Sequence, residues 1–291
     1  MSHPVLEGLR SADPAGRLAA CRGAVDDPSA TLLIDALGEA LADPVREISR
    51  AAGEALVALG RLDRSVDEVL RRALRSQDAG RRFGAAAALA RLTPPGPMLI
   101  PALVEALGQR DGDVRWTAAR LLVDAGRLHP EVLGILLGLA RADERPPVRR
   151  MAVFALRELA PDLPECARTL VQATHDDDAS VRRAALTAMA SLLDPPAFVL
   201  ERLLEVLDGD AHDDPASRRI ATLALGELGA ADPACLPAGS IEQLQALAAS
   251  SRDEGLRRGA TRALARLGLG TQQSPSSSPA GASGRGGFIP G

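Results

Sequence analysis

The chain has 291 residues, of which 46% are hydrophobic and 2% aromatic, so its core must rest on Leu, Ala and Val. Its formal net charge of −4 excludes a generally basic protein that nucleic acid would attract along its whole surface. No apolar run approaches the roughly 18 residues of a membrane span, and no signal-type segment opens the chain, which predicts a cytoplasmic protein. The three cysteines lack metal-type spacing, and we expect them to be reduced thiols.

Predicted helices follow one another in pairs, separated by short breaks rich in Pro, Gly and Asp that remove amide donors or helical torsions. A lead-in helix over 4–12 precedes a partner helix that opens at Asp13-Pro14. The later pairs are predicted over 29–41 with 43–60, 65–76 with 81–92, 98–109 with 114–126, 131–142 with 147–160, 164–173 with 180–193, 198–207 with 215–229 and 241–250 with 254–268.

The segment 111–126 shows why each unit is a helix that needs a neighbour. Asp111 or Asp113 is predicted to cap the first amides, and Gly126 is predicted to end the helix in the left-handed conformation. The apolar residues between them fall on one helical face: Val114, Ala118, Leu121, Leu122 and Ala125. An adjacent unit must cover that face.

The same pattern recurs along the chain at spacings of 32 to 39 residues. The units align on one anchor position: Arg17, Ser49, Arg82, Arg115, Arg149, Arg182, Arg218 and Arg257. Three residues after the anchor every unit carries alanine: Ala20, Ala52, Ala85, Ala118, Ala152, Ala185, Ala221 and Ala260. Seven residues after it comes a core row: Leu56, Leu89, Leu122, Leu156, Met189, Leu225 and Leu264. Such a period predicts stacked helical hairpins, none of which buries its apolar face alone.

We therefore expect an all-α fold, a right-handed α-solenoid of about eight helical hairpins over residues 1–270, followed by a disordered tail at 271–291. The tail is rich in Ser, Pro and Gly, a composition that does not offset the entropy of ordering. It ends in Phe288-Ile289-Pro290-Gly291, which is either a short recognition peptide or part of an inert tail.

The repeat consensus resembles HEAT repeats of the phycobilisome-lyase-like type. One unit shows the pattern clearly: Asp178, Val181, Arg182, Ala184, Ala185, Ala188, Met189 and Leu192. The resemblance covers residues 1 to about 270 and implies the solenoid fold. It leaves the function open, because such repeats occur in scaffolds, chromophore lyases, a DNA glycosylase family and deoxyhypusine hydroxylase.

Residues one, five and nine positions after the anchor point away from the predicted core, and the resemblance implies that this row lines a concave groove. The row holds the sole Trp, two of the four Phe residues and more arginines than acidic residues. We predict that it binds a protein or peptide with acidic groups, because aromatic and Arg side chains form interface hot spots. The candidate residues are Arg50, Phe83, Trp116, Arg120, Arg150, Phe154, Arg183 and Arg219. The alternative is that the aromatic rings fold over neighbours and the arginines pair within helices, as Arg50 with Glu54.

Aspartate and the anchor arginine share a spacing of four residues in six units, as in Asp13/Arg17 and Asp178/Arg182. We expect each aspartate to cap its own helix and each arginine to reach an acidic group of an adjacent turn, which is a structural use. Ser49 replaces the arginine in unit two, where Arg46 or Arg50 is the predicted substitute.

Catalysis has little support in the sequence. The His-Glu pairs that would hold iron in deoxyhypusine hydroxylase are missing, and no phosphate loop or nucleophile motif is present. His175 and Asp177 lie in a turn equivalent to that of His212 and Asp213, so these four residues are weak candidates for a divalent metal, with solvated acidic turns as the stronger interpretation.

We therefore expect a non-catalytic scaffold or adaptor without a cofactor, a metal or a membrane partner. The first alternative is nucleic-acid binding of the HEAT-like DNA glycosylase kind, in which Trp116 and flanking arginines face the duplex. The second alternative, a chromophore-lyase-type subunit, rests on the family resemblance alone.

Overall fold

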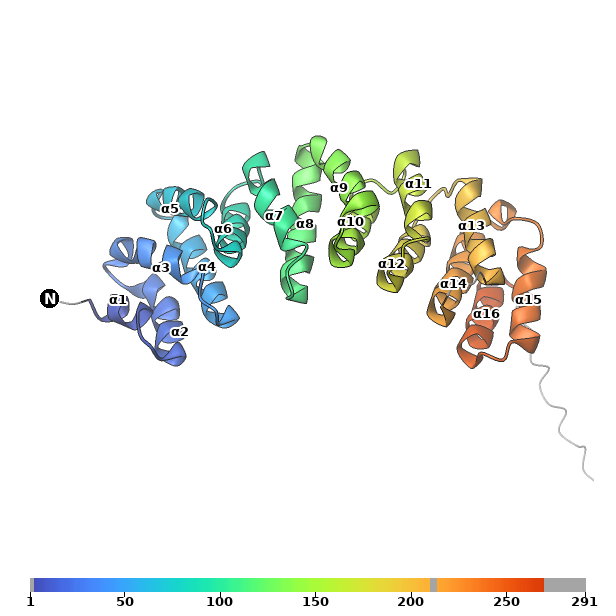
Figure 1. Cartoon of the computed structure of the whole chain (residues 1–291), viewed down its shortest axis with the longest axis horizontal. Coiled ribbons are helices and arrows are strands. Elements are labelled where there is room, and N and C mark those ends of the chain that lie inside the picture. Colours follow the sequence, from blue (N-terminus) through green and yellow to red (C-terminus); the bar gives the residue numbers. More distant parts are fainter. Residues whose placement is uncertain (1–2, 210–213, 270–291) are drawn as a thin grey trace, which may run out of the picture.

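The computed structural model describes residues 3–209 and 214–269, and every regular element in these two ranges is helical. The helices stack side by side into an arc, in which first helices such as α5, α7 and α9 lie on the outer side and second helices such as α4, α8 and α12 on the inner side (Figure 1). This arrangement confirms the α-solenoid of eight hairpins. The predicted tail at 271–291 lies outside the described residues.

The helix bounds follow the predicted pairs, with the largest differences at the start of α3, where the 3-10 turn η2 occupies Ala30–Leu33, and at the end of α12, which stops at Met189. The first four hairpins are α1 (Pro4–Leu9) with α2 (Pro14–Gly23), α3 (Ile34–Ala40) with α4 (Arg46–Gly60), α5 (Ser65–Ala73) with α6 (Ala79–Leu92), and α7 (Ile100–Ala106) with α8 (Gly112–Leu128). The other four are α9 (Glu131–Ala142) with α10 (Pro146–Leu159), α11 (Pro164–Ala173) with α12 (Ala179–Met189), α13 (Ala197–Asp208) with α14 (Pro215–Ala231), and α15 (Ser240–Ser250) with α16 (Glu254–Arg266). Short 3-10 turns lie in the connections: η1 (Ala24–Asp26), η2 (Ala30–Leu33), η3 (Pro97–Leu99) and η4 (Pro233–Cys235).

The core consists of the repeated rows that the period predicts. All eight anchor-plus-three alanines are buried, and so is every member of the anchor-plus-seven row from Leu56 to Leu264. A methyl group at the alanine position lets second helices of consecutive repeats approach closely, while the larger Leu side chains fill the space between layers. Burial of these rows between neighbours is what holds one repeat to the next.

Helix α8 begins as predicted and ends differently. The Asp111 side chain accepts the hydrogen bond from the Asp113 amide, so Asp111 is the cap. The prediction that Gly126 ends the helix in the left-handed conformation is wrong, because α8 continues to Leu128 and Gly126 has no positive φ. A Cβ atom at Gly126 would lie 2.5 Å from a methyl carbon of Leu159 in the next repeat. Glycine is needed there for close packing.

An acid–arginine ladder runs along the turns that join the two helices of each hairpin. Six of these turns supply a capping aspartate: Asp13, Asp78, Asp111, Asp178, Asp214 and Asp253. The anchor arginines reach the following repeat, with Arg17 Nε 2.6 Å from Asp43 and Arg149 Nε 2.6 Å from Asp176. Arg149 also donates to the Asp143 carbonyl in its own turn. The predicted ladder is thus confirmed at these positions, and it ties consecutive repeats together.

Within the described residues the ladder is interrupted in three places. Arg218 donates to the Leu207 carbonyl in its own repeat and forms no ion pair with a described residue. Arg115 donates, among the described residues, only to the carbonyl oxygens of Gln109 and Arg110, because Asp143 in the next turn is bound by the local Arg145 at 3.0 Å. In unit two, the prediction that Arg46 or Arg50 replaces the missing anchor arginine is wrong. Arg50 lies near Glu54 on its own helix, and Arg46 extends along the inner face of the arc instead.

The three cysteines are free thiols, with Cys21 and Cys166 buried and Cys235 half-buried. Burial raises the pKa of the Cys21 and Cys166 thiols to about 11. These two thiols therefore stay protonated at neutral pH and act as small apolar side chains in the core. No helix in the described ranges is long and apolar enough to cross a membrane.

Candidate partner-binding groove

The predicted partner-binding residues all lie on second helices, which form the inner side of the arc (Figure 1). Arg50 comes from α4, Phe83 from α6, Trp116 and Arg120 from α8, Arg150 and Phe154 from α10, Arg183 from α12 and Arg219 from α14. Because each helix supplies its residues at the same positions after the anchor, they form a row that crosses the repeats. We call this row and the hollows along it the inner groove.

A hollow of about 330 Å³ lies in the inner groove between α4, α6 and α8. Its floor is apolar and consists of glycine and alanine backbone together with Leu41, Phe83 and Val114. Gly53, Gly80 and Gly84 leave space here because they carry no side chain. Its rim is charged and consists of Arg46, Arg50, Glu54, Arg91 and Asp113. An apolar floor inside a charged rim suits a protein side chain better than a free ion.

Arg46 spans the hollow from one side to the other. It starts at the first residue of α4 and passes over the repeat that contains α6 to reach the start of α8. Its guanidinium lies 2.7 Å from Asp111 and 2.9 Å from Asp113. The sequence analysis missed this contact, because the partners lie two repeats apart and no local spacing connects them. The Arg46 side chain is 52% exposed, so these ion pairs add little stability and a carboxylate of a partner can compete for them.

An aromatic pair continues the inner groove from α8 to α10. The rings of Trp116 and Phe154 meet edge to face with their centroids 4.3 Å apart, and the Arg157 guanidinium lies 5.2 Å from the Phe154 centroid. Trp116 is 45% exposed, whereas Phe154 and Phe83 are half-buried and pack against the core. The two phenylalanines thus partly follow the alternative of folding over neighbours, and Trp116 presents open aromatic surface.

Most acidic side chains of the inner groove already have an arginine partner. Glu54 lies 3.9 Å from Arg50, Asp124 lies 2.8 Å from Arg127, and Glu158 lies 2.6 Å from Arg157. Several groove arginines form no ion pair with any described residue: Arg91, Arg120, Arg150, Arg219 and Arg262. Arg183 is an intermediate case, 3.5 Å from Asp214 of the next repeat. The groove therefore carries a local excess of positive charge within an acidic chain.

Comparison with protein families supports the repeat assignment. Residues 82–157 and 135–211 both match the family profile of HEAT repeats. Residues 82–211 of the chain carry HEAT repeats. The finer likeness to phycobilisome-lyase-like repeats stays a prediction, since the matching profile is the general one. No curated protein sequence matches the chain significantly.

Solved structures share the HEAT-repeat solenoid. The Escherichia coli protein YibA aligns at 19% identity and a TM-score of 0.56, over 91% of each chain. Kap95p, from a structure with RanGDP, aligns at 14% identity and a TM-score of 0.62 over 90% of this chain and 40% of its own. Kap121p aligns at 14% identity and a TM-score of 0.63 over 90% of this chain and 33% of its own. This chain thus spans less than half of Kap95p or Kap121p, and at these identities the likeness shows the fold alone.

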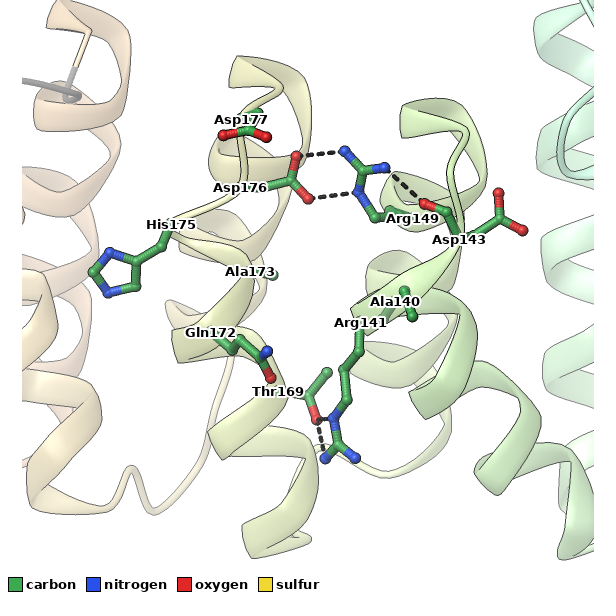
Figure 2. Close-up of a pocket in the computed structure, with 11 residues that line it drawn as sticks. Ala140, Arg141, Asp143, Arg149, Thr169, Gln172, Ala173, His175, Asp176 and Asp177 are labelled. Carbon is green, nitrogen blue, oxygen red and sulfur yellow. Dashed lines mark hydrogen bonds and ion pairs between the residues drawn. The ribbon is translucent and has the colours of Figure 1, made fainter.

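A larger hollow of about 430 Å³ lies elsewhere, between the first helices α9 and α11 of two consecutive HEAT repeats (Figure 2). Its charged lining is already engaged: Arg149 binds Asp176, and Arg141 donates to the Thr169 hydroxyl at 2.8 Å. We assign this hollow to repeat packing, because its strongest polar contacts belong to the acid–arginine ladder. The smaller hollow on the inner groove has unused apolar surface, so it is the better binding candidate.

The weak metal candidates fall on one edge of the HEAT array. His175 is exposed and points away from the hollow between α9 and α11, and Asp177 is exposed as well (Figure 2). His212 and Asp213 lie outside the described residues. Among the residues that are described, no group of three or more His, Cys, Asp and Glu side chains could hold a metal ion. The four-residue site is not assembled within the described part of the chain.

Proposed function

We propose that this chain is a cytoplasmic, non-catalytic scaffold or adaptor that binds a protein segment with acidic groups along its inner groove. The observation that carries the proposal is the juxtaposition, on one face of the solenoid, of an apolar hollow, an exposed Trp116 and arginines that form no ion pair with any described residue. Free thiols at all three cysteines suit a reducing compartment. Kap95p has been solved with RanGDP and with Nup1, which supports a protein as the kind of partner that such a solenoid receives.

The groove offers two kinds of contact to such a segment. The hollow between α4, α6 and α8 accepts an apolar side chain, whose burial supplies affinity. Arg120 and Arg150, from neighbouring repeats, flank the Trp116–Phe154 pair and bind carboxylates through bidentate hydrogen bonds. Because the repeats hold these groups on rigid helices, little entropy is lost on the scaffold side when a partner binds.

Affinity capture tests the proposal. Wild type is compared with a triple variant, Phe83→Ser, Trp116→Ser and Phe154→Ser, and with Ile135→Ser, which removes an exposed apolar side chain from the outer helix α9. We expect wild type and Ile135→Ser to capture a protein that the triple variant does not capture. Far-UV circular dichroism should show that all three chains are folded. Equal capture by the triple variant would place the site elsewhere.

Nucleic-acid binding is the second candidate, favoured by the arginines beside Trp116 that form no ion pair within the described part of the chain. The overall charge of −4 and the absence of Lys weigh against it, since phosphate contacts dominate such affinity. Nuclease treatment of the lysate separates the two candidates. Capture that disappears with nuclease, together with duplex DNA binding that falls steeply with added salt, would replace the protein partner with nucleic acid.

A further inference from the structure

The two edges of the solenoid differ in chemistry. One edge holds the turns within hairpins and carries the acid–arginine ladder. The opposite edge holds the turns that join one repeat to the next, where Thr31 Oγ lies 3.2 Å from Asp63 of the following turn. We refer to this second side as the joining edge. It is distinct from the inner groove, and nothing in the proposed function uses it.

Exposed large apolar side chains collect on the joining edge. Six consecutive joins carry one in the turn or at its border, with the exposed fraction of each residue as follows: Leu32 71%, Leu62 86%, Met98 45%, Leu128 53%, Leu163 44% and Leu193 83%. Turns of a folded chain are usually polar, so an apolar residue at each of six successive joins is unexpected. A regular apolar row of this kind marks an interaction surface.

Charges along the joining edge change sign from one half to the other. The turn after α4 carries Arg61 and Arg64, both exposed and without an ion pair among the described residues, on either side of Asp63, which accepts a hydrogen bond from Thr31. The turns after α10 and α12 carry Asp162 and Asp194, which are exposed and equally unpaired within that set. Leu128, the last residue of α8, lies midway between the two halves.

We propose that the joining edge is a homodimer interface, in which two copies of this chain lie antiparallel about a twofold axis near Leu128. A twofold interface pairs each residue with a different one on the partner, so a surface that is basic at one end and acidic at the other complements itself. The antiparallel arrangement places Leu62 opposite Leu193 and Met98 opposite Leu163. It also brings Arg61 and Arg64 to Asp194.

A second copy fits this edge better than a lipid surface. A segment that lies on an anionic bilayer needs a basic polar face around its apolar residues, whereas the acidic half of the joining edge would be repelled. The row is also narrow, with one large side chain in each turn, so it buries less than the roughly 1,600 Å² of a standard protein interface. We therefore expect a dissociation constant on the order of micromolar, not nanomolar.

Sedimentation equilibrium of the purified full-length chain tests the proposal. Wild type should dimerise in the micromolar range, and the double variant Leu62→Ser, Leu193→Ser should raise the dissociation constant at least about tenfold. Leu32→Ser is the matched control, because Leu32 is 71% exposed on the same edge but would face the turn after α14, which carries no exposed large apolar residue among those described. Its dissociation constant should equal that of wild type.

Charge reversal tests the antiparallel arrangement itself. Arg64→Asp and Asp194→Arg should each weaken the homodimer, since both twofold-related contacts then place like charges together. A mixture of the two variants should recover wild-type affinity. In the mixed dimer, the two introduced side chains carry opposite charges and face each other at one contact, while the other contact keeps the native Arg64 and Asp194. Mixing that restores nothing would overturn the proposal.

Two further results would overturn it. One is a chain that stays monomeric at every concentration up to several hundred micromolar. The other is a monomer that sediments with phosphatidylserine–phosphatidylcholine vesicles and loses that binding in the Leu62→Ser, Leu193→Ser variant, which would make the edge a lipid surface. Neither result bears on the inner groove, whose capture test uses residues on the second helices.

Discussion

Two glycine-to-alanine changes in helix interiors should have opposite effects. Gly138 lies on α9 with nothing within 4 Å of an added Cβ, whereas Gly226 is buried in α14 and its added Cβ would lie 2.6 Å from both Cα and Cβ of Ala263 on α16. Alanine in a helix interior gains about 1 kcal/mol over glycine. The Gly138→Ala variant should therefore raise the free energy of unfolding by about 1 kcal/mol.

At Gly226 the same gain is opposed by overpacking. Carbon atoms in contact normally lie about 3.5 to 4.0 Å apart, so α16 must move by about 1 Å against its own backbone. Overpacking of this kind costs about 1 to 3 kcal/mol, which leaves a net change between zero and about 2 kcal/mol of destabilisation. The two variants should thus differ by about 1 to 3 kcal/mol.

Urea unfolding measures this difference with two probes. Far-UV circular dichroism reports all helices, and fluorescence of the single Trp, Trp116, reports α8. Because repeats couple mainly to neighbours, Gly226→Ala should lower the circular dichroism midpoint more than the fluorescence midpoint. If Gly226→Ala were as stabilising as Gly138→Ala by both probes, the close contact between α14 and α16 would be refuted.

Three further predictions concern the core, the caps and the thiols. Ala118→Leu should overpack the contact between second helices and cost about 1 to 3 kcal/mol, so a melting temperature equal to wild type would contradict the alignment of the repeats. The Ser180 hydroxyl, which donates to Asp178, holds the pKa of that carboxyl below its ordinary value. The resulting stabilisation is complete above about pH 4 and is lost as pH falls through the folded-state pKa. Asp178→Asn keeps a capping side chain but does not titrate, so the melting temperature of this variant should fall less than that of wild type between pH 5 and pH 3. An equal fall in both proteins would contradict this prediction. At pH 8 a thiol reagent should modify the half-buried Cys235 quickly and the two buried cysteines only on unfolding, whereas three equal rates would contradict their burial.

The parts of the fold that repeat could be predicted from the sequence. The alanine row recurs at every anchor and the anchor-plus-seven row in every unit from the second on, so their burial follows from the period without knowledge of any single contact. The proximity of Trp116 and Phe154 could also be predicted from the period, because both residues occupy outward positions in adjacent repeats. Capping aspartates were also predictable, since a cap depends only on residues in its own turn.

Contacts that depend on one particular pair of side chains could not be predicted. Arg46 reaches Asp111 across a whole repeat, over the hollow that Gly80 and Gly84 of α6 line. A glycine at position 126 is compatible with either a helix end or a close contact between helices. The structure shows the close contact, because the Leu159 side chain of the next repeat packs against Gly126. At Arg115 the ladder is interrupted because Asp143 pairs with the nearby Arg145 and not with Arg115 of the previous repeat.

The most direct test of the inner groove as a binding site is the affinity of the captured protein for two charge-matched variants. Arg120→Glu with Arg150→Glu changes the groove, whereas Arg168→Glu with Arg252→Glu makes the same change in net charge on exposed residues away from it. Loss of two charge-assisted contacts should weaken binding by at least about tenfold in the groove variant, while the control should bind like wild type. Equal affinities for the two variants would contradict the central claim that the inner groove receives the acidic groups of the partner.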